Sequence, residues 1–189
     1  MVTLIGISGS IRQGSFNSAL LRAAAQLLPN GAALRIATIR GIPLYDADVE
    51  TSEGIPTVVA ALKDDIAAAD GLLVATPEYN NSMPGVTKNA FDWLSRPPSD
   101  IRRVFGGKPV ALVGASPGAY GTLLSHNAWL PVFRTLGAQL WSEGRLLVPR
   151  AQGVFAEDGS LTDPKVRDAL RSFLEGYLKF VESARRGQS

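Results

Sequence analysis

The sequence has 189 residues and not one cysteine among them. That absence excludes disulfides, iron–sulfur clusters, thiolate zinc sites and cysteine nucleophiles together. Histidine is almost missing too, because His126 is the only one, and a single histidine cannot build a metal site. We therefore expect no bound metal, and any redox chemistry must come from a bound cofactor.

Strong charge of either sign and long apolar runs are also missing. The 19 Lys and Arg residues against 17 Asp and Glu residues give a net charge of +2, without the basic stripe that nucleic acid or an anionic membrane would need. No run reaches the roughly 18 apolar residues of a membrane span, and the apolar residues 1–7 lack a basic leader. We therefore expect a cytoplasmic protein that has neither nucleic acid nor membrane as a partner.

Apolar residues are plentiful, at 46% of the chain, which suits an ordinary globular core. The length fits one domain, which we place at residues 1–189, with about 182–189 as a frayed tail. Short β-branched runs alternate with segments of helical periodicity. Strands are predicted at 2–7, 33–38, 72–76 and 109–115 and within 140–148, and helices at 17–28, from 56 beyond 66, at 86–94, at 123–136 and at 165–181.

This alternation predicts parallel β–α–β units, whose right-handed crossovers place helices on both faces of one sheet. Five such units form a small doubly wound α/β domain with three layers, α/β/α. The order of the strands does not follow from periodicity. In either common order, ligands bind beyond the carboxyl ends of the strands, near the point where the winding reverses. The loops after the first, third and fourth strands are therefore the candidate site.

The first of these loops, residues 9–17, places hydroxyl, amide and guanidinium groups just before a helix. Free N–H groups and the helix dipole favour a phosphate there, and Arg12 would add a bidentate contact. Ser15 stands where a P-loop needs lysine, and no G-x-G-x-x-G follows the strand, so a nucleoside triphosphate or a directly bound dinucleotide is disfavoured. The alternative is that Ser15 merely caps the helix while Arg12 is solvated.

The second loop, residues 76–84, is rich in proline and asparagine. Such a loop can present backbone donors and acceptors to the edge of a planar heterocycle, while Tyr79 offers a flat apolar surface. Taken without the first loop, it would equally suit an ordinary turn between a strand and a helix.

The third loop, residues 114–121, has glycines that let a ligand approach the backbone closely. It also spells G-x-S-x-G, which would make Ser116 the nucleophile of a serine hydrolase. Two features argue against this alternative. The oxyanion hole needs an N–H that Pro117 does not have, and His126 does not follow an acidic residue in the order that such hydrolases require.

Together these loops resemble the NADPH-dependent FMN reductase family, which includes bacterial quinone, azo-dye and chromate reductases. The family pattern G-S-x-R-x-x-S-x-N matches residues 9–17, and its P-E-Y-N matches residues 77–80. The resemblance spans nearly the whole chain. It implies a flavodoxin-like strand order, FMN phosphate on the first loop and the isoalloxazine ring along the second. The candidate FMN-binding residues are Ser10, Arg12, Ser15, Phe16, Asn17, Pro77, Glu78, Tyr79, Asn80, Ser116 and Gly118.

The resemblance also implies an oxidoreductase that takes hydride from NADPH or NADH onto FMN and reduces a small acceptor such as a quinone, an azo compound, chromate or free flavin. Because the flavin carries the demanding chemistry, we name no catalytic residue. The alternative is a flavodoxin-type electron carrier. Carriers of that kind are strongly acidic, so the near-neutral charge of this chain argues against it.

Members of the family form homodimers or homotetramers with the flavin near a subunit boundary, and we expect the same here. Trp93, Trp129 and Trp141 would suit such an interface, although aromatic residues more often belong to a core. For His126 we expect a place on a helix surface or in an interface.

Overall fold

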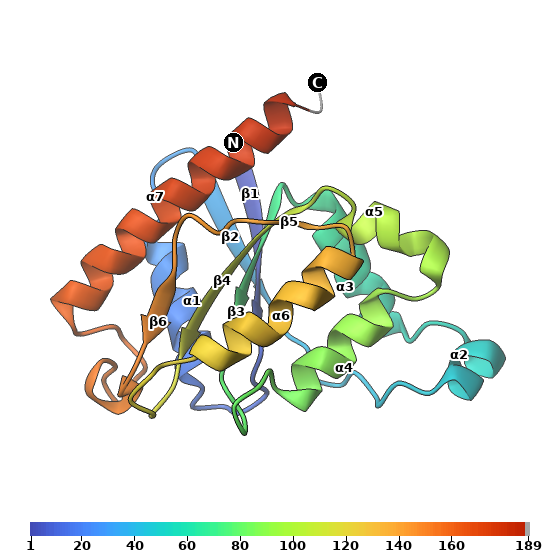
Figure 1. The fold of residues 1–189 in the computed structure, drawn as a ribbon, viewed down its shortest axis with the longest axis horizontal. Coiled ribbons are helices and arrows are strands. Elements are labelled where there is room, and N and C mark those ends of the chain that lie inside the picture. Colours follow the sequence, from blue (N-terminus) through green and yellow to red (C-terminus); the bar gives the residue numbers. More distant parts are fainter. Residues whose placement is uncertain (188–189) are drawn as a thin grey trace.

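The apolar runs of the sequence form parallel strands in the computed structural model, which describes residues 1–187 (Figure 1). The strands are β1 (Val2–Ser8), β2 (Ala32–Ala37), β3 (Gly71–Ala75), β4 (Pro109–Ala115), β5 (Gln139–Leu140) and β6 (Leu146–Val148). Their order is β2-β1-β3-β4-β5, with β6 also paired to β4. This is the flavodoxin-like order, so the predicted fold class is confirmed.

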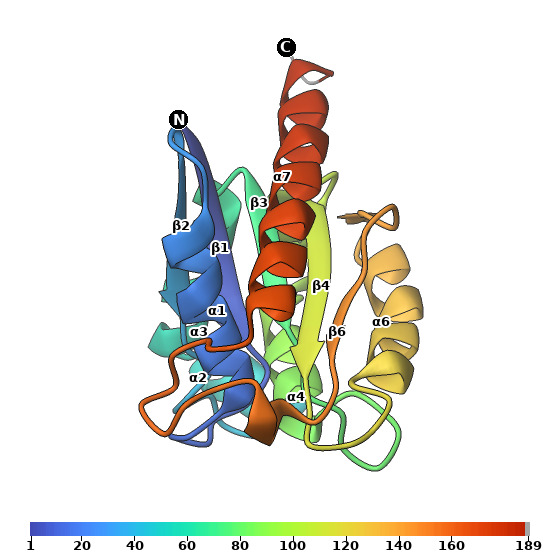
Figure 2. The same cartoon turned by 90° about the vertical axis from the view of Figure 1, so that its left-hand side faces the viewer.

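Helices cover both faces of the sheet, which explains why β3 and β4 are buried at every residue. One face carries α1 and α7, and the other carries α3, α4 and α6 (Figure 2). The helices are α1 (Phe16–Leu27), α2 (Ala47–Glu53), α3 (Thr57–Ala68), α4 (Gly85–Leu94), α5 (Ile101–Phe105), α6 (Leu123–Thr135) and α7 (Pro164–Arg186), with 3-10 turns at Pro98–Asp100 and Ala151–Gly153.

The last strand position differs from the prediction. Instead of one strand within 140–148, two short strands pair with β4, and residues 142–145 leave the sheet between them, after the Trp141 N–H has donated to the Val110 carbonyl at 2.8 Å. The Trp141 ring packs edge-on against Phe173, with centroids 4.9 Å apart. Gly144 lies so close to that ring that a Cβ on it would be 2.2 Å from the indole. The chain bends around the buried indole, and six strands replace the expected five.

Two short helices, α2 and α5, lie in segments for which no helix is predicted. The acidic segment at 46–53 forms α2 because the Asp46 side chain caps it, accepting from the Asp48 N–H at 2.8 Å. The last helix is longer than the predicted 165–181. Helix α7 continues to Arg186, fixed by buried Val181 and by an ion pair between Arg185 and Asp70. Residues 188–189 of the expected tail lie outside the described residues.

The three tryptophans belong to the core of this chain. Trp93 and Trp129 have no exposed surface, and Trp141 is 7% exposed, so the interface interpretation of these residues is wrong. The expectation of a surface position for His126 is wrong as well, because it is 6% exposed on α6. Its helical face points toward β4 and the sheet edge rather than outward.

The carboxyl ends of the strands point to the bottom of Figure 1, and both chain ends lie near the top. The loops after β1, β3 and β4 therefore gather at one edge of the sheet, as predicted for parallel strands. No helix within residues 1–187 combines the length and the apolar character that crossing a bilayer requires.

Candidate functional site

The loop after β1 ends in a capped helix with free donors. Ser15 caps α1, its hydroxyl accepting from the Ser18 N–H at 3.3 Å. Within the described residues, the backbone N–H groups of Ser15, Phe16 and Asn17 have no protein acceptor. Ser15 and Asn17 are also buried. Partnerless N–H groups at a helix start form a site for an anion, and their number suits the phosphate of a mononucleotide.

Two side chains of this loop have different roles. Arg12 is exposed, forms no ion pair within residues 1–187, and lies over the Phe16 ring with its guanidinium carbon 5.5 Å from the centroid. It is therefore available to a ligand. The Asn17 carboxamide is already engaged, because it donates to the Ala115 carbonyl at 2.9 Å and accepts from the Ala115 N–H at 3.0 Å. Asn17 thus fastens α1 to the end of β4 and offers a ligand its backbone N–H.

The loops after β1 and β3 meet at Gly9. Its N–H donates to the Ala75 carbonyl at 2.8 Å, and its carbonyl accepts from the Thr87 hydroxyl at 2.7 Å. A Cβ on Gly9 would lie 2.9 Å from the Thr87 Oγ1 and 3.0 Å from the Pro77 Cδ. Only glycine lets the two loops approach this closely.

The tip of the loop after β3 is a two-residue hairpin. Tyr79 and Ser82 exchange backbone hydrogen bonds of 3.0 Å each, and between them Asn80 and Asn81 take φ values of 49° and 60°. Asparagine is the residue other than glycine that best tolerates this left-handed conformation. The hairpin presents Tyr79, which is 47% exposed, at the sheet edge.

The base of the same loop is tied to α6. The Glu78 carboxylate accepts from the N–H groups of Leu124 at 2.8 Å and Ser125 at 3.1 Å. It caps α6 in place of Thr122, whose side chain makes no capping bond. Behind it, the buried Thr76 hydroxyl lies 2.8 Å from the Ser125 Oγ and accepts from the Trp129 indole at 3.0 Å.

The loop after β4 places Ser116 and Gly118 beside the chain that follows β6. The Ser116 hydroxyl donates to the Gly121 carbonyl at 2.6 Å, so it is not paired with His126 and the hydrolase alternative has no triad. Gly118 is exposed, and its carbonyl accepts from the Arg150 N–H at 3.0 Å. The Ser116 hydrogen bond thus fixes the conformation of the loop, and Gly118 leaves the backbone of the loop exposed.

Sequence analysis missed the segment after β6, residues 149–161. Phe155 stacks on Phe16 with ring centroids 5.8 Å apart, so this segment borders the start of α1. Together they enclose a cavity of about 460 Å³ lined by residues 13–16, Ala19, Arg22, Gln152 and 155–159. The rule that ligands bind beyond the carboxyl ends of strands applies equally to β6 and could have pointed to it.

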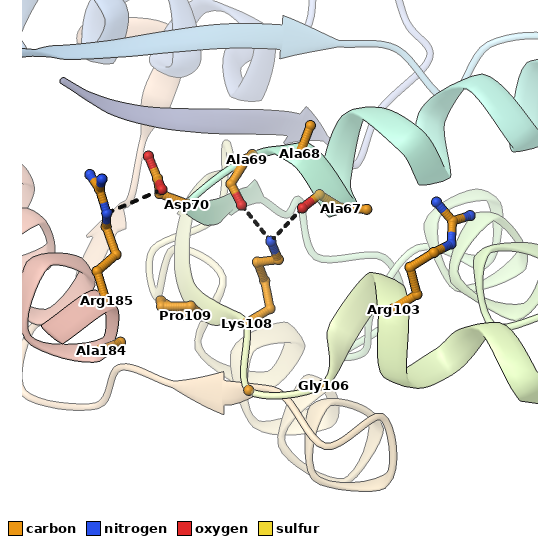
Figure 3. Close-up of a pocket in the computed structure, with 11 residues that line it drawn as sticks. Ala67, Ala68, Ala69, Asp70, Arg103, Gly106, Lys108, Pro109, Ala184 and Arg185 are labelled. Carbon is orange, nitrogen blue, oxygen red and sulfur yellow. Dashed lines mark hydrogen bonds and ion pairs between the residues drawn. The ribbon is translucent and has the colours of Figure 1, made fainter. Parts of the chain in front are cut away.

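A second hollow, of about 330 Å³, lies at the opposite edge of the sheet (Figure 3). Its cations already have partners. Lys108 donates to the carbonyls of Ala67 and Ala69 at the end of α3, and burial lowers its pKa. Arg185 pairs with Asp70, and Arg103 binds Asp64 and Asp100. Because these groups are engaged, the hollow is not a candidate site for an anionic cofactor.

Residues 2–153 match the sequence model of the NADPH-dependent FMN reductase family. The chain belongs to this family. The NAD(P)H-dependent FMN reductase of Pseudomonas aeruginosa is 41% identical over 184 residues, covering 97% of each chain. A 2-hydroxy-1,4-benzoquinone reductase from a Burkholderia species is 38% identical, covering 95% of this chain and 96% of the relative.

Among solved structures, the chain is similar to FerB, a flavoenzyme NAD(P)H:(acceptor) oxidoreductase from Paracoccus denitrificans. It aligns with a TM-score of 0.86 at 31% identity, over 97% of this chain and 99% of its own. The family predicted from the motifs at 9–17 and 77–80 is therefore confirmed. In this member of the family, both motifs lie at the same sheet edge and touch each other through Gly9.

Proposed function

We propose that this chain is an NAD(P)H-dependent reductase that uses FMN to reduce quinone-type acceptors. FMN as cofactor and NAD(P)H as co-substrate follow from the family and from relatives that are 35–41% identical over nearly the full chain. The observation that carries the proposal for the site is the set of partnerless, partly buried N–H groups at the start of α1, with an unpaired Arg12 beside them.

The residues of the site would position and enclose the cofactor, and we assign no chemical step to any of them. FMN, when bound, supplies the hydride-accepting ring. Ser10, Arg12, Ser15 and the α1 N–H groups would hold its phosphate, and Pro77 to Asn80 would border the ring. Ser116 and Gly118 would close the third side. The exposed Tyr79 and Tyr120, at 47% and 84%, leave an apolar surface against which a nicotinamide or a quinone can lie.

Replacing Arg12 with Ala tests the phosphate assignment. A lost charge-assisted contact costs about 1.5–3 kcal/mol, which is roughly a 10- to 150-fold weaker FMN affinity. Riboflavin has the same ring and no phosphate, so its affinity should stay unchanged. Both affinities can be measured by quenching of flavin fluorescence.

The matched control is Arg171→Ala, which removes an exposed arginine on α7 that pairs with Asp168 and lies outside the loops of the site. It should leave the FMN affinity within a factor of about two, since a distant solvated charge contributes little. Equal losses for FMN and riboflavin in Arg12→Ala would mean that Arg12 does not bind the phosphate.

Kinetics distinguish the reductase from a carrier. NADPH should be oxidised rapidly with a soluble quinone and no partner protein present. Because nicotinamide and acceptor would use the same exposed face in turn, initial-rate plots should be parallel. Intersecting plots would contradict alternate occupancy, and a requirement for a protein partner would favour the carrier.

We extend the proposal to assembly and location. Leu44, Tyr120 and Leu124 expose 82%, 84% and 43% of their surface near the site, which supports a homodimer or homotetramer that covers them. Sedimentation at micromolar concentration tests this. We also propose a cytoplasmic location, because reduced nicotinamide is a cytoplasmic metabolite. Residues 1–189 would act as one FMN-binding domain.

A further inference from the structure

The loop to which we assign the FMN phosphate, residues 9–15, has an exposed interior and buried ends. Residues 11–14 are exposed, whereas Gly9 and Ser15 are buried. An exposed loop interior gains little from packing, and segments with few buried contacts open most easily. The shape of this loop therefore depends on the bonds that hold its two ends.

Ser18, in the first turn of α1, is hydrogen-bonded to both ends of the loop. Its N–H donates to the Ser15 Oγ at 3.3 Å. Its hydroxyl donates to the Oγ of Ser8 at 2.9 Å, and Ser8 is the last residue of β1 and 5% exposed. The pair of hydroxyls thus joins the end of the strand to the start of the helix, with the whole loop between them.

The contacts continue from Ser8 into the loop. The Ser8 hydroxyl donates to the Ser10 carbonyl at 3.4 Å, and the Ser10 Oγ accepts from the Arg12 N–H at 3.3 Å. Both distances are longer than is usual for hydrogen bonds, so the bond between Ser18 and Ser8 is the shortest of the side-chain contacts at this loop. The motif G-S-x-R-x-x-S-x-N covers residues 9–17 and includes neither Ser8 nor Ser18.

A phosphate needs the Arg12 side chain and the N–H groups of residues 15–17 to converge. When only a fraction of the molecules has the loop in that shape, the apparent affinity falls by the same fraction. We propose that Ser18, acting through Ser8, is a positioning residue that holds the loop in its phosphate-binding shape and so sets the preference of the protein for FMN over riboflavin. Ser18 has this role only if the loop holds the FMN phosphate, as in the proposed function.

A purely structural role for the same bond predicts a different result. A buried hydroxyl such as that of Ser8 needs a partner, and a bond that only met this need would contribute to stability. Its loss would then affect FMN and riboflavin equally, because both flavins carry the same ring. The ratio of the two affinities is therefore the quantity that decides between the roles.

The test is Ser18→Ala, which removes the hydroxyl and keeps the N–H that bonds to Ser15. FMN affinity should fall roughly 2- to 13-fold, which is the net worth of one hydrogen bond, while riboflavin affinity stays unchanged. Ser18→Thr keeps a hydroxyl and should restore FMN affinity. Ser172→Ala, at an exposed serine on α7, is the matched control and should change neither affinity. Quenching of flavin fluorescence measures all of them.

A second variant shows whether Ser18 acts through Ser8. Ser8→Ala should lower FMN affinity at least as much, and adding Ser18→Ala to it should cause no further loss, because the bond is already gone. An unchanged ratio of FMN to riboflavin affinity in Ser18→Ala, or losses that add in the double variant, overturns the proposal.

The unmodified protein separates this result from a failure of the proposed function. If it binds FMN no more tightly than riboflavin, the loop does not hold a phosphate, and the assigned site fails together with the role of Ser18. If it prefers FMN and Ser18→Ala keeps the full preference, the site stands and only the positioning role of Ser18 is wrong.

Discussion

Burial of the single histidine makes the folded state sensitive to acid. The pKa of His126 is about 4 in the folded protein, against 6.5 ordinarily, because burial penalises the charged ring. Between these values the unfolded chain binds more protons than the folded one. Stability therefore rises with pH across this interval, is complete above about pH 6.5, and is lost as the pH falls toward about 4.

We predict that the free energy of unfolding drops by about 3 kcal/mol between pH 7 and pH 4 from this residue. Urea unfolding at several pH values measures it. In His126→Gln the slope between pH 6.5 and pH 5 should flatten, since the sequence has no other histidine. An unchanged slope in that variant would assign the acid sensitivity to other groups.

Individual site residues were predictable by position but not by contact. The motifs placed Arg12 and Tyr79 at the sheet edge, where the structure has them exposed. The roles of Asn17 and Glu78 were not predictable. Their side chains bind Ala115 and the first turn of α6, and a bond across 98 or 46 residues leaves no trace in local spacing.

At the scale of elements, the loop after β3 and α6 behave as one unit. Glu78 supplies the cap that α6 lacks, and Thr76 joins Ser125 and Trp129 beneath it. The hairpin at 79–82 stands on this base. Its position at the site therefore depends on a helix that belongs to the next β–α unit.

We predict that Glu78→Ala lowers the free energy of unfolding by about 1–2 kcal/mol, and Glu78→Gln by about half of that, as for a lost helix cap and a lost charge at a helix start. FMN affinity should fall in the same order, because the hairpin loses its base. Denaturation and FMN titration provide the two measurements.

Glu175→Ala, an exposed change on α7, is the matched control and should alter neither quantity. If Glu78→Ala weakened FMN binding without any loss of stability, the carboxylate would act on the cofactor directly and the capping role would be wrong.

The periodicity of the sequence predicted the long strands well, but it did not predict the irregular elements. The strands at 2–8, 71–75 and 109–115 are long apolar runs that any parallel sheet would bury. The break at Trp141 depends on where its indole packs against Phe173, which is a tertiary contact. Helix α2 buries no residue, so it has no amphipathic pattern to detect.

At the scale of the molecule, the strand order gathers every predicted loop at one edge. Alternation of strands and helices predicted the layers, while the order β2-β1-β3-β4-β5 came only through the family resemblance. Residues from four connections, after β1, β3, β4 and β6, border the proposed site. A ligand bound there would contact segments from most of the chain.

We predict that FMN therefore stabilises the whole fold. At a hundred-fold excess over its dissociation constant the gain is about 2.7 kcal/mol, which corresponds to roughly 5–10 °C in melting temperature for a chain of this size. Differential scanning calorimetry measures the shift. Arg12→Ala should show a smaller one at the same FMN concentration, and an FMN-independent melting temperature would contradict binding at this edge.

The site loops are hydrogen-bonded to neighbouring segments at their bases, whereas the side chains at their tips are exposed. Substitutions at the bases should therefore disturb the fold, and substitutions at the tips should not. Gly9, Asn17 and Glu78 each hold two segments together, so their substitutions would require compensating changes elsewhere. The exposed side chains of Tyr79 and Tyr120 make no hydrogen bond within residues 1–187 that holds the fold in place. A library that randomises these two tips can search for new acceptors while the scaffold remains intact.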